Sequence, residues 1–282
     1  AVGSGFGAVR EYRDRFFRTS AQVRSELHLE YLGSMAKISK LPRTEGPEES
    51  QATSLWLAES LGGYVRLMPR SAFAETLRNV KVAADAALSD VPCKVIGVIS
   101  CLPSEGKTTI SANLASLISM QGARVLLIDG DMRNPGLSRS MKRRPAQTLI
   151  DAILGAAPPE ACMQWDQSGR LAVLPTSIRQ RISHSSDLLA SPGMAELLDK
   201  LRESFDYIIV DLPPIGPVVD AKAFAHRVDG FLCVVEWGKT SRTLVRNVMA
   251  ANPIFREKCL GVVLNKEDET RMRLYRSGDS GD

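Results

Sequence analysis

Six short runs of almost uninterrupted apolar residues limit the folds open to this chain more than any other feature. They cover residues 95–99, 125–128, 171–174, 207–210, 231–235 and 260–264. Continuous apolar runs are typical of strands that are covered on both faces in a parallel sheet. Helical patterns lie between the runs, for example over residues 108–121, which Gly122 closes, and over residues 192–205. The sequence therefore predicts an α/β fold with a doubly wound, mostly parallel sheet.

The first apolar run leads into a loop with the features of a phosphate-binding loop. From residue 98 to residue 109 the chain reads Val-Ile-Ser-Cys-Leu-Pro-Ser-Glu-Gly-Lys-Thr-Thr. Backbone N–H groups at a helix start, a lysine ammonium and a metal-binding hydroxyl suit the charged end of a nucleoside triphosphate. The usual pattern has glycine five residues before Gly106, where this chain has Cys101. The surrounding sequence must therefore support the assignment.

Carboxylates follow two other runs. Asp129 and Asp131 come after the second run, and Asp211 ends the segment Tyr-Ile-Ile-Val-Asp. Ligands of doubly wound sheets bind beyond the carboxyl ends of the strands, so we expect these side chains near the loop. Two carboxylates held together repel each other unless a cation such as Mg²⁺ lies between them. A polar turn or an ordinary cap would also explain each aspartate.

Together these segments resemble the three-motif set of the bacterial tyrosine kinases, the cytoplasmic domains attached to polysaccharide co-polymerases of capsule and exopolysaccharide export. The three motifs read Ser100-x-x-Pro103-x-Glu105-Gly106-Lys107-Thr108, Asp129-x-Asp131-x-Arg133 and Asp211-x-Pro213-Pro214. The resemblance implies a P-loop fold and an ATP-dependent protein-tyrosine (auto)kinase that regulates chain-length control and export. Its partners would be ATP, tyrosine-containing protein acceptors and further copies of itself.

The resemblance also implies roles for individual residues. Lys107, Asp129, Asp131 and Asp211 would be catalytic, with Asp129 as the base for the acceptor tyrosine. Thr108 and the three aspartates would bind Mg²⁺. A structural ion pair would explain Arg133 as well as charge neutralisation does, and a turn would explain Asn265 as well as an adenine contact does. The ATP-binding residues would be Pro103, Ser104, Glu105, Gly106, Lys107, Thr108, Thr109, Arg133 and Asn265.

A helix is expected from Ser71, and it carries a further point of resemblance. Glu75-x-x-Arg78-x-x-Lys81 is similar to the segment with which family members form a ring of subunits, with lysine in the last place. Ion pairs along a solvated helix face would also explain this spacing. The resemblance implies a ring-like homo-oligomer.

Four parts are expected along the chain: a membrane-proximal segment over residues 1–40, a linker over 41–70, the ATP-binding kinase domain over 71–266 and a flexible tail over 267–282. In the first part, a helix over residues 21–27 is capped by Thr19 or Ser20, and an extended piece covers residues 29–32. Residues 10–32 resemble the stretch after the second transmembrane helix of succinoglycan-type export proteins. This implies the cytoplasmic face of the bacterial inner membrane, reached through upstream helices.

Two features separate the alternatives. The tail contains only Tyr275, where family members usually have a tyrosine cluster, so Tyr275 is the single tail candidate for a phosphoacceptor. A surface-cycling ATPase of the partition type would have a second lysine at position 102, where this chain has Leu102.

A non-catalytic, nucleotide-gated scaffold of the export complex is the third hypothesis. The net charge of +4 is too small for a dedicated nucleic-acid binder.

Overall fold

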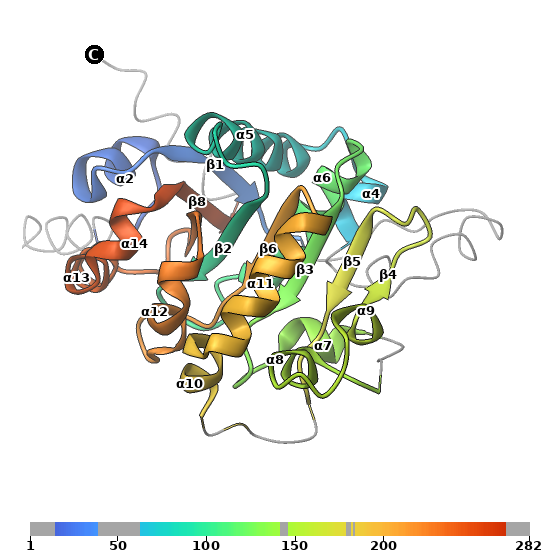
Figure 1. The fold of residues 1–282 in the computed structure, drawn as a ribbon. Helices are drawn as coiled ribbons and strands as arrows, with labels where there is room; N and C mark the ends of the chain where they lie inside the picture. The colour runs from blue at the N-terminus through green and yellow to red at the C-terminus, as the bar shows by residue number, and fades with distance from the viewer. Residues whose placement is uncertain (1–14, 39–62, 142–145, 179–181, 183, 269–282) are drawn as a thin grey trace, which may run out of the picture.

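Eight strands form one sheet in the order β1-β8-β7-β2-β6-β3-β5-β4 (Figure 1). The computed structural model describes residues 15–38, 63–141, 146–178, 182 and 184–268. All strand pairs are parallel except the pair of β4 and β5. The strands are β1 (Tyr31–Ala36), β2 (Lys94–Ser100), β3 (Val125–Asp129), β4 (Gln164–Trp165), β5 (Leu171–Leu174), β6 (Tyr207–Asp211), β7 (Gly230–Glu236) and β8 (Cys259–Glu267). The predicted doubly wound α/β fold is confirmed.

Helices cover both faces of the sheet, and α10, α11 and α12 lie over the face turned to the viewer in Figure 1. The helices are α2 (Ser20–Leu27), α4 (Tyr64–Leu67), α5 (Ala72–Ala87), α6 (Lys107–Met120), α7 (Gly136–Ser140), α8 (Leu149–Ile153), α9 (Pro159–Cys162), α10 (Ser185–Ala190), α11 (Pro192–Ser204), α12 (Asp220–Phe224), the 3-10 helix η2 (Ala225–Arg227), α13 (Arg242–Ala251) and α14 (Pro253–Glu257). The helices α4 to α7 pack on the opposite face.

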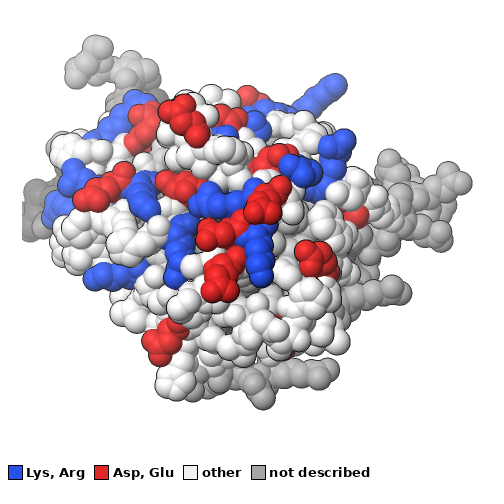
Figure 2. All heavy atoms as spheres, viewed as in Figure 1, with Lys and Arg blue, Asp and Glu red and all other residues white. Residues whose placement is uncertain are grey.

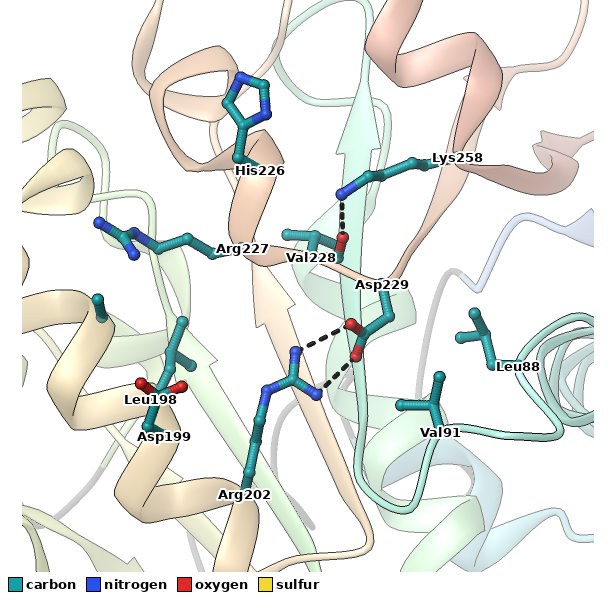
Figure 3. A pocket seen from close by; sticks show the side chains of 11 residues that line it. Leu88, Val91, Leu198, Asp199, Arg202, His226, Arg227, Val228, Asp229 and Lys258 are labelled. Carbon is teal, nitrogen blue, oxygen red and sulfur yellow. Dashed lines mark hydrogen bonds and ion pairs between the residues drawn. The ribbon is translucent and has the colours of Figure 1, made fainter.

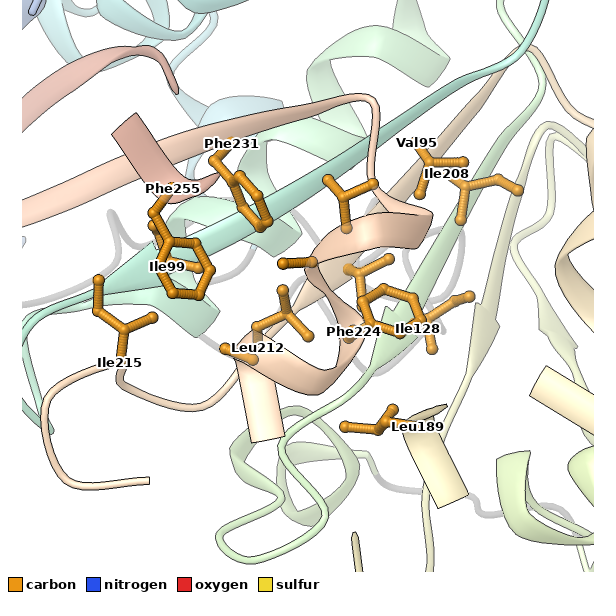
Figure 4. Packing of buried hydrophobic residues seen from close by; sticks show 14 of the residues in the cluster. Val95, Ile99, Ile128, Leu189, Ile208, Leu212, Ile215, Phe224, Phe231 and Phe255 are labelled. Atoms are coloured by element: carbon orange, nitrogen blue, oxygen red, sulfur yellow. The ribbon is translucent and has the colours of Figure 1, made fainter. Parts of the chain in front are cut away.

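The sheet separates two hydrophobic cores, one on each face. In the core on the viewer's side, Phe224, Phe231 and Phe255 fill the space between the sheet and the covering helices (Figure 4). The rings of Phe231 and Phe255 meet edge to face with centroids 5.0 Å apart. Residues of β2, β3 and β6 alternate between the two cores, which explains why these three runs are almost continuously apolar. Each of the six predicted runs lies in a strand.

The predicted helix after Ser71 is confirmed as α5. The Ser71 hydroxyl accepts a hydrogen bond from the backbone N–H of Ala74 at 3.2 Å, which caps the first turn. One face of α5 is apolar and buried, and it includes Phe73, Leu77, Val80 and Ala84. Thr19 caps α2 in the same way, and Gln22 completes a capping box.

Strand β1 differs from the extended piece expected over residues 29–32. It covers Tyr31–Ala36 and pairs in parallel with β8 at the edge of the sheet. Its pattern of burial is irregular, because an edge strand has one neighbour and is only partly covered, so the sequence lacks the continuous apolar run of the inner strands. The two-residue strand β4 is too short to leave a pattern.

The segment before α2 also packs against the main fold. Phe17 is fully buried, and its backbone oxygen accepts the N–H of Gly238 at 2.8 Å. The backbone oxygen of Arg15 accepts the N–H of Arg242 at 2.8 Å. Much of the expected membrane-proximal part is thus attached to the sheet, while the division of the chain into four parts stays a prediction. Within the described ranges, no helix combines the length and apolarity needed to cross a membrane.

Candidate active site

The loop between β2 and α6 needs glycine at only one of the two positions in the usual phosphate-loop pattern. Ser104 has a φ of 65° and Gly106 a φ of 101°, so both lie in the left-handed region. A Cβ atom at Gly106 would also lie 2.1 Å from the side-chain nitrogen of Asn265. Cys101 is not among the described residues with positive φ, and its side chain is buried. A side chain at position 101 is therefore compatible with this loop.

The first turn of α6 brings a cation and a hydroxyl to the carboxyl edge of the sheet. Lys107 is buried, and its positive charge opposes the rise in pKa that burial causes at Asp131 and at Asp211. The Thr108 hydroxyl donates a hydrogen bond to Oδ2 of Asp211 at 2.6 Å. The unpaired N–H groups of the helix start add partial positive charge at this end. An anion held here would meet both the ammonium group and the helix terminus.

Asp129 and Asp211 lie side by side because β3 and β6 are neighbouring parallel strands in which these two residues are paired. Both side chains are fully buried. Burial, with the Asp211 charge as a second cause, raises the pKa of Asp129 to about 8. Burial also raises the pKa of Asp211 to about 6, although Lys107 opposes the rise. Two buried carboxyl groups in contact favour either a shared proton or a cation.

The two oxygens of Asp129 differ in their surroundings. Oδ2 accepts hydrogen bonds from the backbone N–H of Ser138 at 2.8 Å and from its hydroxyl at 2.6 Å. Oδ1 is buried and accepts no hydrogen bond within the part of the chain that the structure describes. A buried acceptor without a partner is costly. This atom therefore marks the place where a donor or cation from a ligand would be favourable.

These residues fit a magnesium ion that is shared with a nucleotide. Across the described ranges, no group of three or more His, Cys, Asp or Glu side chains converges closely enough to hold a metal ion by itself. Mg²⁺ usually retains waters and takes one or two carboxylates together with substrate phosphates. The unpartnered oxygen of Asp129, the Thr108 hydroxyl and Asp211 are suitable for such a site. Metal binding by these residues and Asp131 stays a prediction.

Two residues predicted to bind nucleotide use their side chains inside the protein. The Glu105 carboxylate accepts hydrogen bonds from the backbone N–H groups of Leu102 at 2.7 Å and Glu236 at 3.0 Å. Asn265 donates a side-chain N–H to the backbone oxygen of Glu105 at 2.8 Å. A motif gives the position of a residue but not the direction of its side chain. Contacts of these two residues with a nucleotide stay predictions.

Arg133 forms the structural ion pair that the sequence left open. Its Nε atom lies 2.8 Å from Oδ2 of Asp220, which is buried at the start of α12. The Ser185 hydroxyl donates to the other oxygen of Asp220. The Arg133 side chain is 41% exposed, so it also remains open to solvent. A role of Arg133 in binding the transferred group stays a prediction.

The remaining predicted residues lie in three places. Pro103 and Ser104 are exposed on the loop, and Thr109 is half-buried in the first turn of α6. The residues predicted for oligomerisation lie on α5. Tyr275 lies outside the described residues. Sequence reasoning missed Ser138, Asp220 and Thr240, whose hydroxyl donates to Glu105, since a single polar residue in a loop or short helix carries no recognisable signal.

A cavity of about 480 Å³ lies at the opposite edge of the sheet, by the amino ends of β2, β7 and β8 (Figure 3). Arg202 and Asp229 form two hydrogen bonds of 2.9 Å across it. Lys258 donates to the backbone oxygen of Val228 at 2.7 Å. Arg202 and Asp229 thus satisfy each other, Lys258 is bonded to backbone oxygen, and the surface in Figure 2 mixes both signs of charge. The carboxyl edge, with its unpartnered carboxylate oxygen, is the stronger candidate site.

The chain is similar to known proteins in sequence and in fold. A family model described as an AAA domain matches residues 93–241. The succinoglycan biosynthesis transport protein ExoP of Rhizobium meliloti (strain 1021) is 38% identical over 293 residues. That alignment covers all of this chain and 37% of ExoP, so the chain spans about a third of that protein.

A tyrosine-protein kinase and a crystal structure are also similar to this chain. The tyrosine-protein kinase YwqD of Bacillus subtilis (strain 168) is 30% identical over 207 residues, which cover 73% of this chain and 86% of YwqD. The crystal structure of the chimerical protein CapA2B2 superposes with a TM-score of 0.74 and 26% identity. It covers 89% of this chain and all of the CapA2B2 chain.

Proposed function

This chain belongs to the bacterial tyrosine kinases of the P-loop type, and on that basis we propose that it transfers the γ-phosphoryl group of ATP to tyrosine hydroxyls in an exopolysaccharide export system. The observation that carries the proposal is the group formed by Lys107, Thr108, Asp129 and Asp211 at the carboxyl edge of the sheet. It combines an anion site with a carboxylate oxygen that has no partner in the described part of the chain.

The nucleotide phosphates would bind at the start of α6, where Lys107 and the N–H groups of the first turn face them. Thr108, Asp129, Asp131 and Asp211 would hold Mg²⁺, which when bound neutralises charge on the phosphates. Asp131 lies close enough to Lys107 for their charges to interact, which helps to place the ammonium group. The protein's part in catalysis is thus mainly positioning and charge stabilisation.

Asp129 would act as the base. In the transfer, the bond between the γ-phosphorus and its bridging oxygen breaks, a bond to the tyrosine oxygen forms, and ADP leaves. The proton of the tyrosine hydroxyl would pass to the Asp129 carboxylate, which Ser138 holds in place through two hydrogen bonds to Oδ2. Because burial and the Asp211 charge raise the pKa of Asp129 to about 8 in the nucleotide-free chain, its ionised form is strongly basic, and the active base would be the carboxylate that forms when a bound cation displaces its proton.

The experiment is to incubate the purified chain with Mg²⁺ and labelled ATP and to measure phosphotyrosine and free phosphate. We expect phosphotyrosine, and we expect the Tyr275→Phe variant to lose most of it, because Tyr275 is the single tyrosine after residue 207. Tyr31→Phe is the matched control, because Tyr31 lies in the edge strand β1. Free phosphate without phosphotyrosine would instead identify an ATPase, and unchanged labelling of Tyr275→Phe would place the acceptor elsewhere.

A ring-like homo-oligomer and attachment to the inner membrane through upstream helices are part of the proposal. On α5, Arg78 lies 2.6 Å from Glu75, and the Glu75 side chain is 65% exposed. Lys81 instead lies 2.6 Å from Asp85, which also accepts the hydroxyl of Tyr207. The first two residues are therefore more available to a second copy than Lys81 is.

Size-exclusion chromatography with light scattering tests the ring. We expect the combined change of Glu75→Ala and Arg78→Ala to lower the mass of the assembly toward that of a single chain. Lys81→Ala is the matched variant, and we expect it to keep the mass and to lower the unfolding temperature slightly, since it breaks an intramolecular pair worth about 0.5 kcal/mol. An unchanged mass in the first variant would remove the proposed interface.

A further inference from the structure

The buried side chain of Glu105 connects the phosphate loop to a neighbouring part of the fold. This residue is 1% exposed, and both of its carboxylate oxygens accept hydrogen bonds. Oε2 accepts the backbone N–H of Leu102 at 2.7 Å, within the loop. Oε1 accepts the backbone N–H of Glu236 at 3.0 Å and also the hydroxyl of Thr240. The carboxylate therefore connects the loop after β2 with the turn after β7, which lies 135 residues farther along the chain.

The end of β8 adds a second set of contacts to the same loop. Asn265 donates its side-chain N–H to the backbone oxygen of Glu105 at 2.8 Å. The Lys266 ammonium donates to the backbone oxygen of Ser104 and lies 3.4 Å from a carboxylate oxygen of Glu236. Residues from β7 and β8 thus contact two consecutive loop residues.

The conformation of the loop explains why such support is needed. Ser104 and Gly106, the two neighbours of Glu105, both have positive φ. For a residue other than glycine this conformation is unfavourable and persists only where the surroundings enforce it. A buried carboxylate is also costly unless it is hydrogen-bonded. The hydrogen bonds of the Glu105 carboxylate offset the cost of its burial, and they also fix the loop in this unfavourable conformation.

We propose that Glu105 is a positioning residue, which holds the loop in its phosphate-binding shape through Thr240 and Glu236 and does not itself contact the nucleotide. Thr240 is the key partner, because it lies in the turn after β7, far from the phosphate loop in the sequence. Backbone hydrogen bonds to Phe17 hold this turn in place. This inference rests on the proposed nucleotide site. It assigns to Thr240 a part in ATP binding that no motif indicates.

The test measures the dissociation constant for ATP with Mg²⁺ and the KM and kcat of the kinase. We expect Glu105→Gln and Thr240→Val each to weaken ATP binding about 10-fold, with a larger effect on KM than on kcat, because each removes a hydrogen bond to a buried charge. The double variant should be little weaker than either single variant, since both changes break the same connection. Thr240→Ser keeps a hydroxyl and should bind like the wild type.

Thr243→Val is the matched control, because Thr243 is exposed three residues beyond Thr240. Additive effects, or a loss in Glu105→Gln without one in Thr240→Val, would overturn the proposal, because the carboxylate would then act without the turn. Normal ATP binding in both folded variants would overturn it as well while leaving the nucleotide site intact. A wild-type chain that does not bind ATP would refute the proposed function itself and with it this inference.

Discussion

Lys107→Met is expected to lower phosphotyrosine formation about 100- to 1,000-fold. The ammonium of Lys107 is the buried cation at the start of α6, and a methionine of similar length keeps the packing but removes the charge. The same change leaves Asp131 and Asp211 without the positive charge that opposes the rise of their pKa values. The variant should therefore bind nucleotide more weakly and also ionise these carboxyl groups less readily. The measurement is incorporation of labelled phosphate into tyrosine under saturating ATP.

The control for this variant is Lys200→Met, which removes an exposed lysine from α11. Its activity and unfolding temperature should equal those of the wild type. ATP binding to Lys107→Met, followed by calorimetry, should be at least 10-fold weaker, because a hydrogen bond between charged groups is lost. If Lys107→Met retained most of its kinase activity, the phosphates would have to bind elsewhere, and the proposed site would be wrong.

Asp129→Asn is expected to lower phosphotyrosine formation by about 100-fold or more, because the variant has no carboxylate to accept the tyrosine proton. It should also change the pH dependence of stability in the nucleotide-free protein. The folded chain raises the pKa of Asp129 from 3.8 to about 8. Its contribution to stability is therefore fully present below the unfolded pKa and is lost as the pH rises toward the folded pKa.

Between pH 5 and pH 7, the unfolded chain has Asp129 ionised and the folded chain has it protonated. The free energy of unfolding should fall by about 1.4 kcal/mol per pH unit from this group alone. The Asp129→Asn variant lacks this term, so the difference between the two proteins should change with that slope. Denaturant unfolding at several pH values measures it, with the exposed Asp90→Asn as control. Parallel curves for wild type and Asp129→Asn would mean that Asp129 is already ionised in the folded chain.

Much of this arrangement was predictable because it depends on which segments are inner parallel strands and on the residues that follow them. Apolar runs without interruption mark the inner strands, and residues that follow parallel strands meet at one edge. The pairing of Asp129 with Asp211 is the direct result, since β3 and β6 are neighbours in register. The edge strand β1 was misplaced by a few residues because its partial burial leaves no regular pattern.

Side-chain direction limited the prediction of the site. Glu105 belongs to the loop motif, and a motif residue is easily assigned to the ligand, yet its carboxylate points toward Thr240. Ser138 holds Asp129 through two hydrogen bonds, but nothing distinguishes it from other serines in the sequence. Such partners become visible only when segments far apart in the chain are placed together.

The contact between Lys266 and the phosphate loop bears on whether phosphate is transferred within one chain or between two chains. Lys266 donates to Ser104, and β8 ends at Glu267, eight residues before Tyr275. Eight residues span at most about 28 Å, so this length bounds how far Tyr275 can lie from Glu267 of its own chain. Such a tether corresponds to an effective concentration on the order of millimolar. If Tyr275 is the acceptor, as proposed, a neighbouring copy would have to outcompete it, and the dependence of the initial rate on protein concentration distinguishes transfer within one chain from transfer between chains.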